Sequence, residues 1–251
     1  MAKAQFARVH TYTPKTLGGI LAEADRQDGF TSHIEEPLPA SWSLGSRASV
    51  LTAVSNYMSK PATVNLKSGG TATRKRRLDH RCLIAGVLSW PHSQSEIRGK
   101  DLKIMQDWIT KSEIWLKKSY GNNLAGICVH YDESHPHLHF FIVGDAQRLH
   151  PGMKSELVND TRMTDNKARM AAHKNGLKLW LNDYHESVGQ HFGLERKLDV
   201  RPAWRIKDRS IRAKLVEIDK QLQDNPNPDI LLERNRVWDE SEKTERPEMK
   251  F

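Results

Sequence analysis

The chain has 251 residues, enough to bury the core of one large domain with or without an appendage. It carries 39 Lys and Arg residues against 31 Asp and Glu residues, and the formal charge of +8 favours a polyanionic partner. No apolar run approaches the roughly 18 residues of a membrane span, and the first residues lack the apolar core of a signal peptide. We therefore expect no membrane span and a cytoplasmic location.

The two cysteines, Cys82 and Cys128, each lie inside an apolar, strand-like run. Such positions favour small buried side chains over a disulfide or metal ligands. Cysteine usage therefore gives no indication of export.

The N-terminal part predicts a strand followed by a helix. Residues 5–12 alternate in period two and contain β-branched side chains, which is typical of a strand. Residues 17–26 start with a glycine pair and predict a short helix that stops near Gly29. On that helix Glu23 and Arg26 are three residues apart and share one face.

The next segment predicts a loop, a helix and a basic loop. Prolines and serines predict a loop over residues 35–45, and the apolar spacing of residues 48–60 predicts a helix. Residues 65–77 contain a glycine pair, and we expect them to be flexible. They end in four consecutive cations: Arg74, Lys75, Arg76 and Arg77. Such a run can lie along a phosphate backbone and release counterions on binding.

The middle of the chain alternates strands with a helix. Residues 81–90 are almost continuously apolar and predict a central strand buried on both faces. Ser93 and Glu96 have the spacing of a capping box, so we expect a helix to begin there. Two short strands follow it. The order of elements predicts an antiparallel or mixed sheet covered by helices, an α+β fold.

The C-terminal third is expected to be helical. A helix over residues 166–191 carries Tyr184 on its apolar face, so this tyrosine is expected in the core. A basic segment over residues 201–223 has a helical apolar stripe and includes Arg201 and Arg205. The acidic tail that follows is expected to fray.

The most informative stretch is residues 130–139, which contains four histidines and two carboxylates. Its apolar flanks predict two short strands joined by a turn. Side chains alternate across a strand, so His137 and His139 project from one face, and the turn can bring His130 back beside them. A lone histidine on a strand is usually structural, but three at this spacing favour a divalent cation with open coordination positions, which indicates catalysis.

A histidine metal site, a basic loop and a basic terminal helix together fit phosphodiester chemistry on nucleic acid. A metal there would polarise the scissile phosphate and stabilise the charge that develops on it. A separate nucleophile would attack in line.

The pattern His130-x-Asp132-Glu133-x-x-Pro136-His137-x-His139 resembles the third motif of MobV-type (Pre/Mob) plasmid relaxases, which are HUH endonucleases. Three further segments support the resemblance: Ala7-Arg8-Val9, Leu17-Gly18-Gly19 and Phe192-Gly193-Leu194-Glu195-Arg196. The resemblance spans about residues 5–198.

This resemblance implies a relaxase that recognises a hairpin-bearing plasmid origin, cuts one strand, and stays covalently attached to the 5′-phosphate. It implies a central antiparallel sheet with helices on its faces. His130, His137 and His139 would bind the metal, with Mn²⁺ favoured and Mg²⁺ or Zn²⁺ as alternatives. Glu133 would orient a histidine or adjust the charge of the metal. His135 occupies a variable position and is expected to be an exposed turn residue.

The chain departs from the family pattern at one position. Related relaxases carry a nucleophilic histidine in a His-Asn-x-Arg pattern shortly after Leu-Gly-Gly, and here that stretch is Glu23-Ala24-Asp25-Arg26. Glu23 therefore stands where the histidine is expected. Its carboxylate can attack directly and form an acyl phosphate, while Arg26 binds the phosphate.

Two alternatives stay open. A different residue can attack, with Tyr184 the first candidate because many HUH enzymes use a tyrosine on a later helix, and His10 and His33 the weaker ones. Alternatively, cleavage is lost and the protein is an origin-binding protein or repressor on the same fold.

The resemblance also divides the chain and assigns its partners. Residues 1–198 would form the relaxase domain, and residues 199–251 a basic helical extension with the frayed tail. The expected partner is plasmid origin DNA, as a single strand and a hairpin. The basic run at 74–77, with Arg201 and Arg205, would hold phosphates of the duplex or hairpin arm. Other mobilisation or conjugation proteins are further expected partners.

Overall fold

The computed structural model describes residues 3–32, 34–66, 68–154, 165–196 and 208–224, together with residues 230, 232–234 and 236–238. The chain divides into two compact units, Met1–Lys197 and Leu198–Phe251. The first unit holds the sheet, and the second is helical where it is described.

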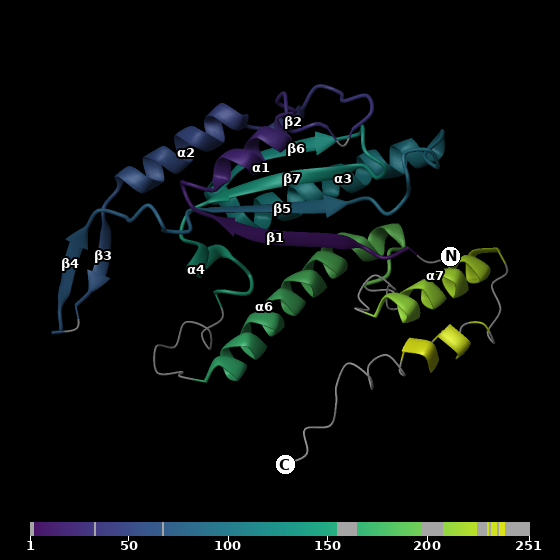
Figure 1. Cartoon of the computed structure of the whole chain (residues 1–251). Helices are drawn as coiled ribbons and strands as arrows, with labels where there is room; N and C mark the ends of the chain where they lie inside the picture. The colour runs from purple at the N-terminus through teal and green to yellow at the C-terminus, as the bar shows by residue number, and fades with distance from the viewer. Residues whose placement is uncertain are drawn as a thin grey trace, which may run out of the picture. The chain divides into compact units, whose positions relative to one another are not determined.

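Five strands form the main sheet of the first unit, in the spatial order β1-β5-β7-β6-β2 (Figure 1). They are β1 (Phe6–Tyr12), β2 (Ser41–Leu44), β5 (Leu83–Ser89), β6 (Leu124–His130) and β7 (His137–Val143). Every neighbouring pair is antiparallel, which confirms the expected α+β fold. The apolar run at residues 81–90 forms an internal strand as expected, although the middle position belongs to β7.

Helices cover both faces of the sheet (Figure 1). They are α1 (Leu17–Ala24), α2 (Arg47–Ser59), α3 (Lys100–Tyr120) and α6 (Asn166–Ser187). The face under α3 and α6, here the α3 face, includes Leu138 and Phe140 in its core. The face under α1 and α2, here the α1 face, includes Phe141 and Val143. Because successive strand side chains alternate, His139 lies on the α1 face.

Shorter elements complete the first unit. They are β3 (Ala62–Asn65), β4 (Thr71–Arg74), α4 (Ala146–Leu149) and the 3-10 turns η1 (Gly121–Asn123) and η2 (Gly189–Phe192). A capping box fixes the start of α2. Ser46 Oγ accepts the Ser49 N–H at 3.1 Å, and Ser49 Oγ accepts the Ser46 N–H at 2.7 Å. The helix predicted over residues 48–60 is confirmed.

Two segments that were predicted to be loops contain strands. Trp42 and Leu44 alternate within β2, and the Trp42 ring packs on Phe141 with centroids 5.7 Å apart. The prediction of a loop over 35–45 was wrong at these positions because the surrounding prolines obscured a short alternating run. The segment predicted to be flexible around Gly69 and Gly70 is the turn of the β3–β4 hairpin, where both glycines have positive φ.

The helix α3 begins later than its capping pattern suggested. Glu96 Oε2 accepts the Ser93 N–H at 3.0 Å, but this bond closes a turn and the helix starts only after Gly99. The turn is held elsewhere, because Gln94 donates its N–H to Ser134 O at 2.9 Å. The prediction of a helix start at Ser93 was therefore wrong, because a contact with the distant residue Ser134 holds this segment in a turn.

The second unit contains α7 (Arg209–Asp224), where the basic helix was predicted. Leu215 of its apolar stripe is buried against Val237 and Trp238. Within the described tail, Arg234, Val237 and Trp238 are helical and buried, so the expectation of fraying was wrong for these three residues. In the described parts of the chain we find no helix whose length and apolar character would let it cross a membrane.

The packing of β5 gives a stability prediction. A Cβ at Gly86 would lie 2.2 Å from Phe140 Cζ and 2.6 Å from Arg8 O, so Gly86→Ala should lower the free energy of unfolding by about 1–3 kcal/mol in urea titrations. Gly18→Ala is the matched control, since no atom lies within 4 Å of its added Cβ. Equal stabilities of the two variants would contradict this account of the sheet.

Candidate metal centre and nucleic-acid surface

Strand register brings three histidines together on the α1 face. His130, the last residue of β6, lies opposite His137, the first residue of β7. His139 follows two residues later on the same face, opposite Cys128. All three side chains are buried, and together they form the histidine triad of this structure. The predicted return of His130 to the edge of the other two is confirmed.

Hydrogen bonds to main-chain carbonyls fix which ring nitrogens face inward. His130 Nε2 lies 2.9 Å from Ala24 O, and His137 Nδ1 lies 2.9 Å from His135 O, so these nitrogens carry the protons. The remaining nitrogens, His130 Nδ1 and His137 Nε2, then face each other at 3.3 Å with lone pairs. Two facing lone pairs repel unless a cation lies between them.

The spacing of the inward nitrogens fits a divalent metal. His137 Nε2 lies 3.2 Å from His139 Nε2, in addition to the 3.3 Å between the first pair. At metal–nitrogen distances of about 2.1 Å, neighbouring ligands in tetrahedral or octahedral geometry lie about 3.0–3.4 Å apart. Three protein ligands would leave the remaining coordination positions for substrate oxygens.

The surroundings keep two of these rings neutral. Burial lowers the pKa of His130 to about 4, and burial with the neighbouring histidines lowers the pKa of His139 well below its ordinary value. Neutral imidazole is the form that binds metals. Cys128 lies 3.7 Å from His130 Nε2, but burial raises the pKa of its thiol to about 12. As predicted, both cysteines are buried and free.

A carboxylate borders the triad, as the sequence suggested for Glu133. Its Oε1 lies 3.6 Å from His137 Nε2 and 3.9 Å from His130 Nδ1. The same oxygen accepts from Arg26 Nη2 at 3.0 Å. His135, in contrast, is exposed in the turn, as expected.

Arg26 lies differently from the prediction. The helix α1 ends at Ala24, and Arg26 has a positive φ of 53°, so it does not share a helical face with Glu23. Its guanidinium is buried and donates to both Asp132 and Glu133. Although burial raises it, the pKa of Asp132 is held below its ordinary value by the Leu38 N–H and by Arg26. Arg26 Nε and Nη1 are buried and have no hydrogen-bond partner among the described residues.

Glu23 lies in the last turn of α1, on the triad side of the sheet. The next residue provides the carbonyl that contacts His130, and Glu23 itself is half-buried. Burial raises the pKa of Tyr12, and two nearby charges also act on it: Arg8 lowers this pKa and Glu23 raises it. Both charges therefore lie within electrostatic range of the Tyr12 hydroxyl.

The position of Tyr184 argues against its role as the nucleophile. It lies in α6, in the core of the α3 face, so the sheet separates it from the triad. Its hydroxyl accepts from Trp108 Nε1 at 3.0 Å, and burial raises its pKa to about 12. The expectation of a core residue is confirmed. Of the weaker candidates, His10 is exposed on β1, and His33 lies outside the described residues.

A basic cleft of about 1,200 Å³ lies between the β3–β4 hairpin and α4. Its cationic side chains are Arg74, Lys75, Arg76, Arg77 and Arg148. Leu83, at the start of β5, pairs with Val143, whereas Val87 pairs with His139. The cleft residues precede Leu83 and follow Val143, so the cleft lies beyond the far end of these strands, at least about 13 Å along them from the triad.

The four consecutive cations are not equivalent in the structure. Arg76 lies over the Tyr57 ring at 4.2 Å and donates to Tyr57 O, and Arg77 forms two hydrogen bonds with Asp79. Arg74 and Lys75 are exposed and make no ion pair within the described part of the chain. The predicted contact residues Arg201 and Arg205 lie outside the described residues.

A model of the Mob_Pre family, described as plasmid recombination enzyme, matches residues 65–199 and so covers more than half of the chain. The chain belongs to the Mob_Pre family. The matched segment contains the triad and the cations of the basic cleft, whereas Glu23 and Arg26 precede it. No curated protein matches the chain.

Solved structures show the same fold as this Mob_Pre chain. Two are Mn-bound crystal structures, at pH 6.8 and pH 4.6, of the MobM relaxase domain (MOBV; Mob_Pre) bound to plasmid pMV158 oriT DNA. Each has a TM-score of 0.51 and 18% sequence identity and covers 78% of this chain. The match covers 90% of the first relaxase chain and 91% of the second.

Three features of the site were not predicted from the sequence of this Mob_Pre chain. The carbonyl of Ala24 orients His130, the carboxylate of Asp132 holds Arg26, and Arg148 joins the basic cleft. Asp132 could have been singled out, since it is part of the histidine motif. The other two depend on long-range packing and leave no local signal.

The triad geometry predicts metal-dependent stability. Mn²⁺ at 100 times its Kd should stabilise the protein by about 2.7 kcal/mol, seen as a rise in Tm. His137→Ala removes one of the facing nitrogens and should abolish this rise. His135→Ala is the matched control, because His135 is exposed in the adjacent turn. A rise that survives His137→Ala would mean that the metal binds elsewhere.

Proposed function

We propose that this Mob_Pre chain is a plasmid mobilisation relaxase that nicks one strand of its origin DNA and remains attached to the 5′-phosphate. The observation that carries the proposal is the histidine triad, whose facing lone pairs fit a catalytic cation. Family membership and the fold of DNA-bound, Mn-bound MobM support it. The protein thus acts as a DNA-nicking and strand-transferring endonuclease.

In this proposal His130, His137 and His139 hold the divalent metal, with Mn²⁺ as the favoured ion. When bound, the metal would polarise the scissile phosphate and stabilise charge on its oxygens. Glu133 accepts from Arg26 and lies 3.6 Å from His137 Nε2 and 3.9 Å from His130 Nδ1, so in this proposal its carboxylate balances the positive charge of the metal. Arg26, with two unpartnered nitrogens, can hold a phosphate oxygen of the substrate.

Glu23 is the nucleophile in this proposal. Its carboxylate oxygen attacks the scissile phosphorus, the P–O3′ bond breaks, and the leaving 3′-oxygen takes up a proton from water to become a hydroxyl. The product is an acyl phosphate, whose high free energy suits later religation. Its position beside the residue that contacts His130 supports this role, as does its place where the family histidine is expected. Burial of Tyr184 in the core of the opposite face supports Glu23 over this alternative.

The replaced histidine also supports a second candidate function. A chain that keeps the triad and the basic cleft but lacks a competent nucleophile would bind the origin without cutting it, as a repressor does. Both functions predict salt-sensitive DNA binding. Only the relaxase predicts a covalent adduct.

We expect the protein, mixed with Mn²⁺ and a supercoiled plasmid that carries its own origin, to form a covalent protein–DNA adduct. Neutral hydroxylamine should release the DNA and leave a hydroxamate on Glu23, located by mass spectrometry, because it attacks acyl phosphates. Glu23→Gln should lose the adduct. Asp28→Asn is the matched control, since Asp28 is an exposed carboxylate shortly after α1.

An adduct that persists in Glu23→Gln would exclude the carboxylate mechanism and leave the relaxase function in place. Absence of any adduct with Mn²⁺, Mg²⁺ or Zn²⁺ would favour the origin-binding protein instead.

The basic cleft predicts how binding depends on salt. The plot of log K against log salt for duplex DNA should flatten by about 0.9 for each lost phosphate contact in Arg74→Ala, Lys75→Ala and Arg148→Ala. Arg77→Ala should change this slope less, because Arg77 is paired with Asp79. Equal slopes for all four variants and the parent protein would place the duplex elsewhere.

A further inference from the structure

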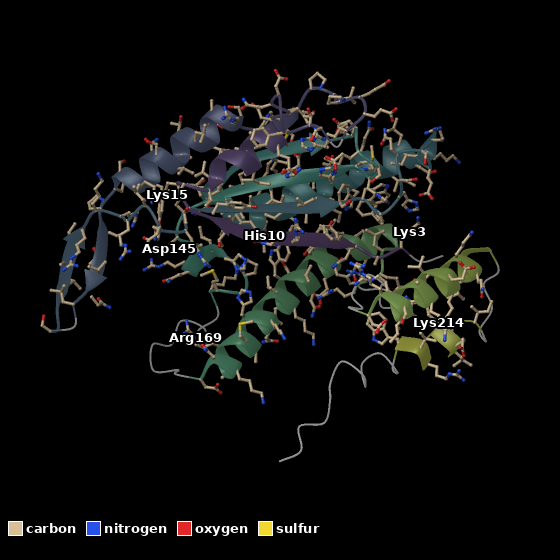
Figure 2. The ribbon with its side chains drawn as sticks, in the orientation of Figure 1. Lys3, His10, Lys15, Asp145, Arg169 and Lys214 are labelled. Atoms are coloured by element: carbon tan, nitrogen blue, oxygen red, sulfur yellow. The ribbon has the colours of Figure 1, made fainter. Side chains whose placement is uncertain are left out.

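The edge strand β1 presents an unusual set of side chains to the α1 face. Val9 is buried in the core of the opposite face, so its neighbours by alternation turn toward the triad side. They form the β1 stripe: Phe6, Arg8, His10 and Tyr12. Phe6, Arg8 and His10 are exposed and Tyr12 is half-buried. Figure 2 shows His10 on this strand.

Register places the stripe directly across from the metal ligands. Phe6 lies in the same row as Ser89 and His137, and Arg8 lies in the same row as Val87 and His139. Two strand spacings of about 4.8 Å put Phe6 and Arg8 each about 10 Å from the histidine of their row, measured between backbones. An arginine side chain spans much of that distance.

The surface between the β1 stripe and the triad is only partly covered, and the stripe carries a cation, Arg8, that is unpaired in the described part of the chain. Val87 and Ser89, between the stripe and the triad, are only partly buried. Arg8 makes no ion pair within the described residues, whereas Arg26 on the other side of the triad is held by two carboxylates. Phe6 is 48% exposed, a large apolar area to leave in water beside a cation.

We propose that the β1 stripe is a platform for single-stranded DNA, on which Phe6 stacks a base and Arg8 binds a phosphate next to the cleavage site. This inference rests on the proposed nicking function and specifies the strand that the enzyme holds. Alternating aromatic and cationic groups are the usual means of binding single strands without sequence preference. Stripe residues two apart are separated by about 6.6 Å, comparable to one extended nucleotide.

The test measures binding of a short oligothymidylate to the full chain by fluorescence anisotropy in EDTA, where no cutting occurs. Phe6→Leu keeps an apolar side chain but loses the ring face, and it should weaken binding about tenfold. Phe6→Trp should retain the affinity. Arg8→Gln should weaken binding and flatten the salt dependence by about 0.7 for the lost phosphate contact.

Arg169→Gln is the charge-matched control, because Arg169 is exposed on α6, which covers the opposite face (Figure 2). It should bind oligothymidylate like the parent protein. A hairpin duplex without a single-stranded end provides the second arm, and its affinity should be unaffected by Phe6→Leu.

Parent-like binding of oligothymidylate by both Phe6→Leu and Arg8→Gln would overturn the platform, whatever the nicking assay shows. Failure of the proposed nicking function has a different signature: the parent protein forms no adduct, while its binding still depends on Phe6 and Arg8. Equal loss of duplex and single-strand binding in Phe6→Leu would also overturn the assignment.

Discussion

The antiparallel pairing of β6 with β7 is the constraint on which the centre depends. It sets His130 opposite His137 and places His139 two residues further along the same face. A shift of one residue would turn all the histidines of β7 into the core that Leu138 and Phe140 occupy. Apolar side chains on the opposite face therefore fix the register, and the register creates the cation site. The carbonyls of Ala24 and His135 then select the tautomers that face inward.

The electrostatics around the triad follow from burial. Neutral histidines suit a cation, but a buried cation needs compensating charge, and Asp132 and Glu133 supply it from the turn between the strands. Arg26 binds both carboxylates and connects the end of α1 to this turn. The segment that carries Glu23 is therefore held against the metal centre, and the open side faces β1. Glu23, the histidine triad and the β1 stripe share one face of the sheet, while α3 and α6 cover the other.

Much of this arrangement could be predicted from local patterns. The alternation of residues 137–143 gave the correct faces, and the three ligating positions came from the spacing of the histidines alone. Residues whose roles depend on distant contacts could not be found in this way. Arg26 was predicted to continue a helix, yet it has a positive φ and forms salt bridges with Asp132 and Glu133. Arg76 and Arg77 looked equivalent to Arg74 in the sequence, and only packing on Tyr57 and pairing with Asp79 distinguish them.

The central claim is that the triad binds one divalent metal and leaves coordination positions for the DNA phosphate. Anomalous diffraction at the manganese edge, from crystals of the protein soaked in Mn²⁺, tests it most directly. The account predicts a single strong peak at about 2.1 Å from His130 Nδ1, His137 Nε2 and His139 Nε2, with no further protein ligand. A peak on Asp132 and Glu133 away from the histidines, or no peak at the triad, would contradict it.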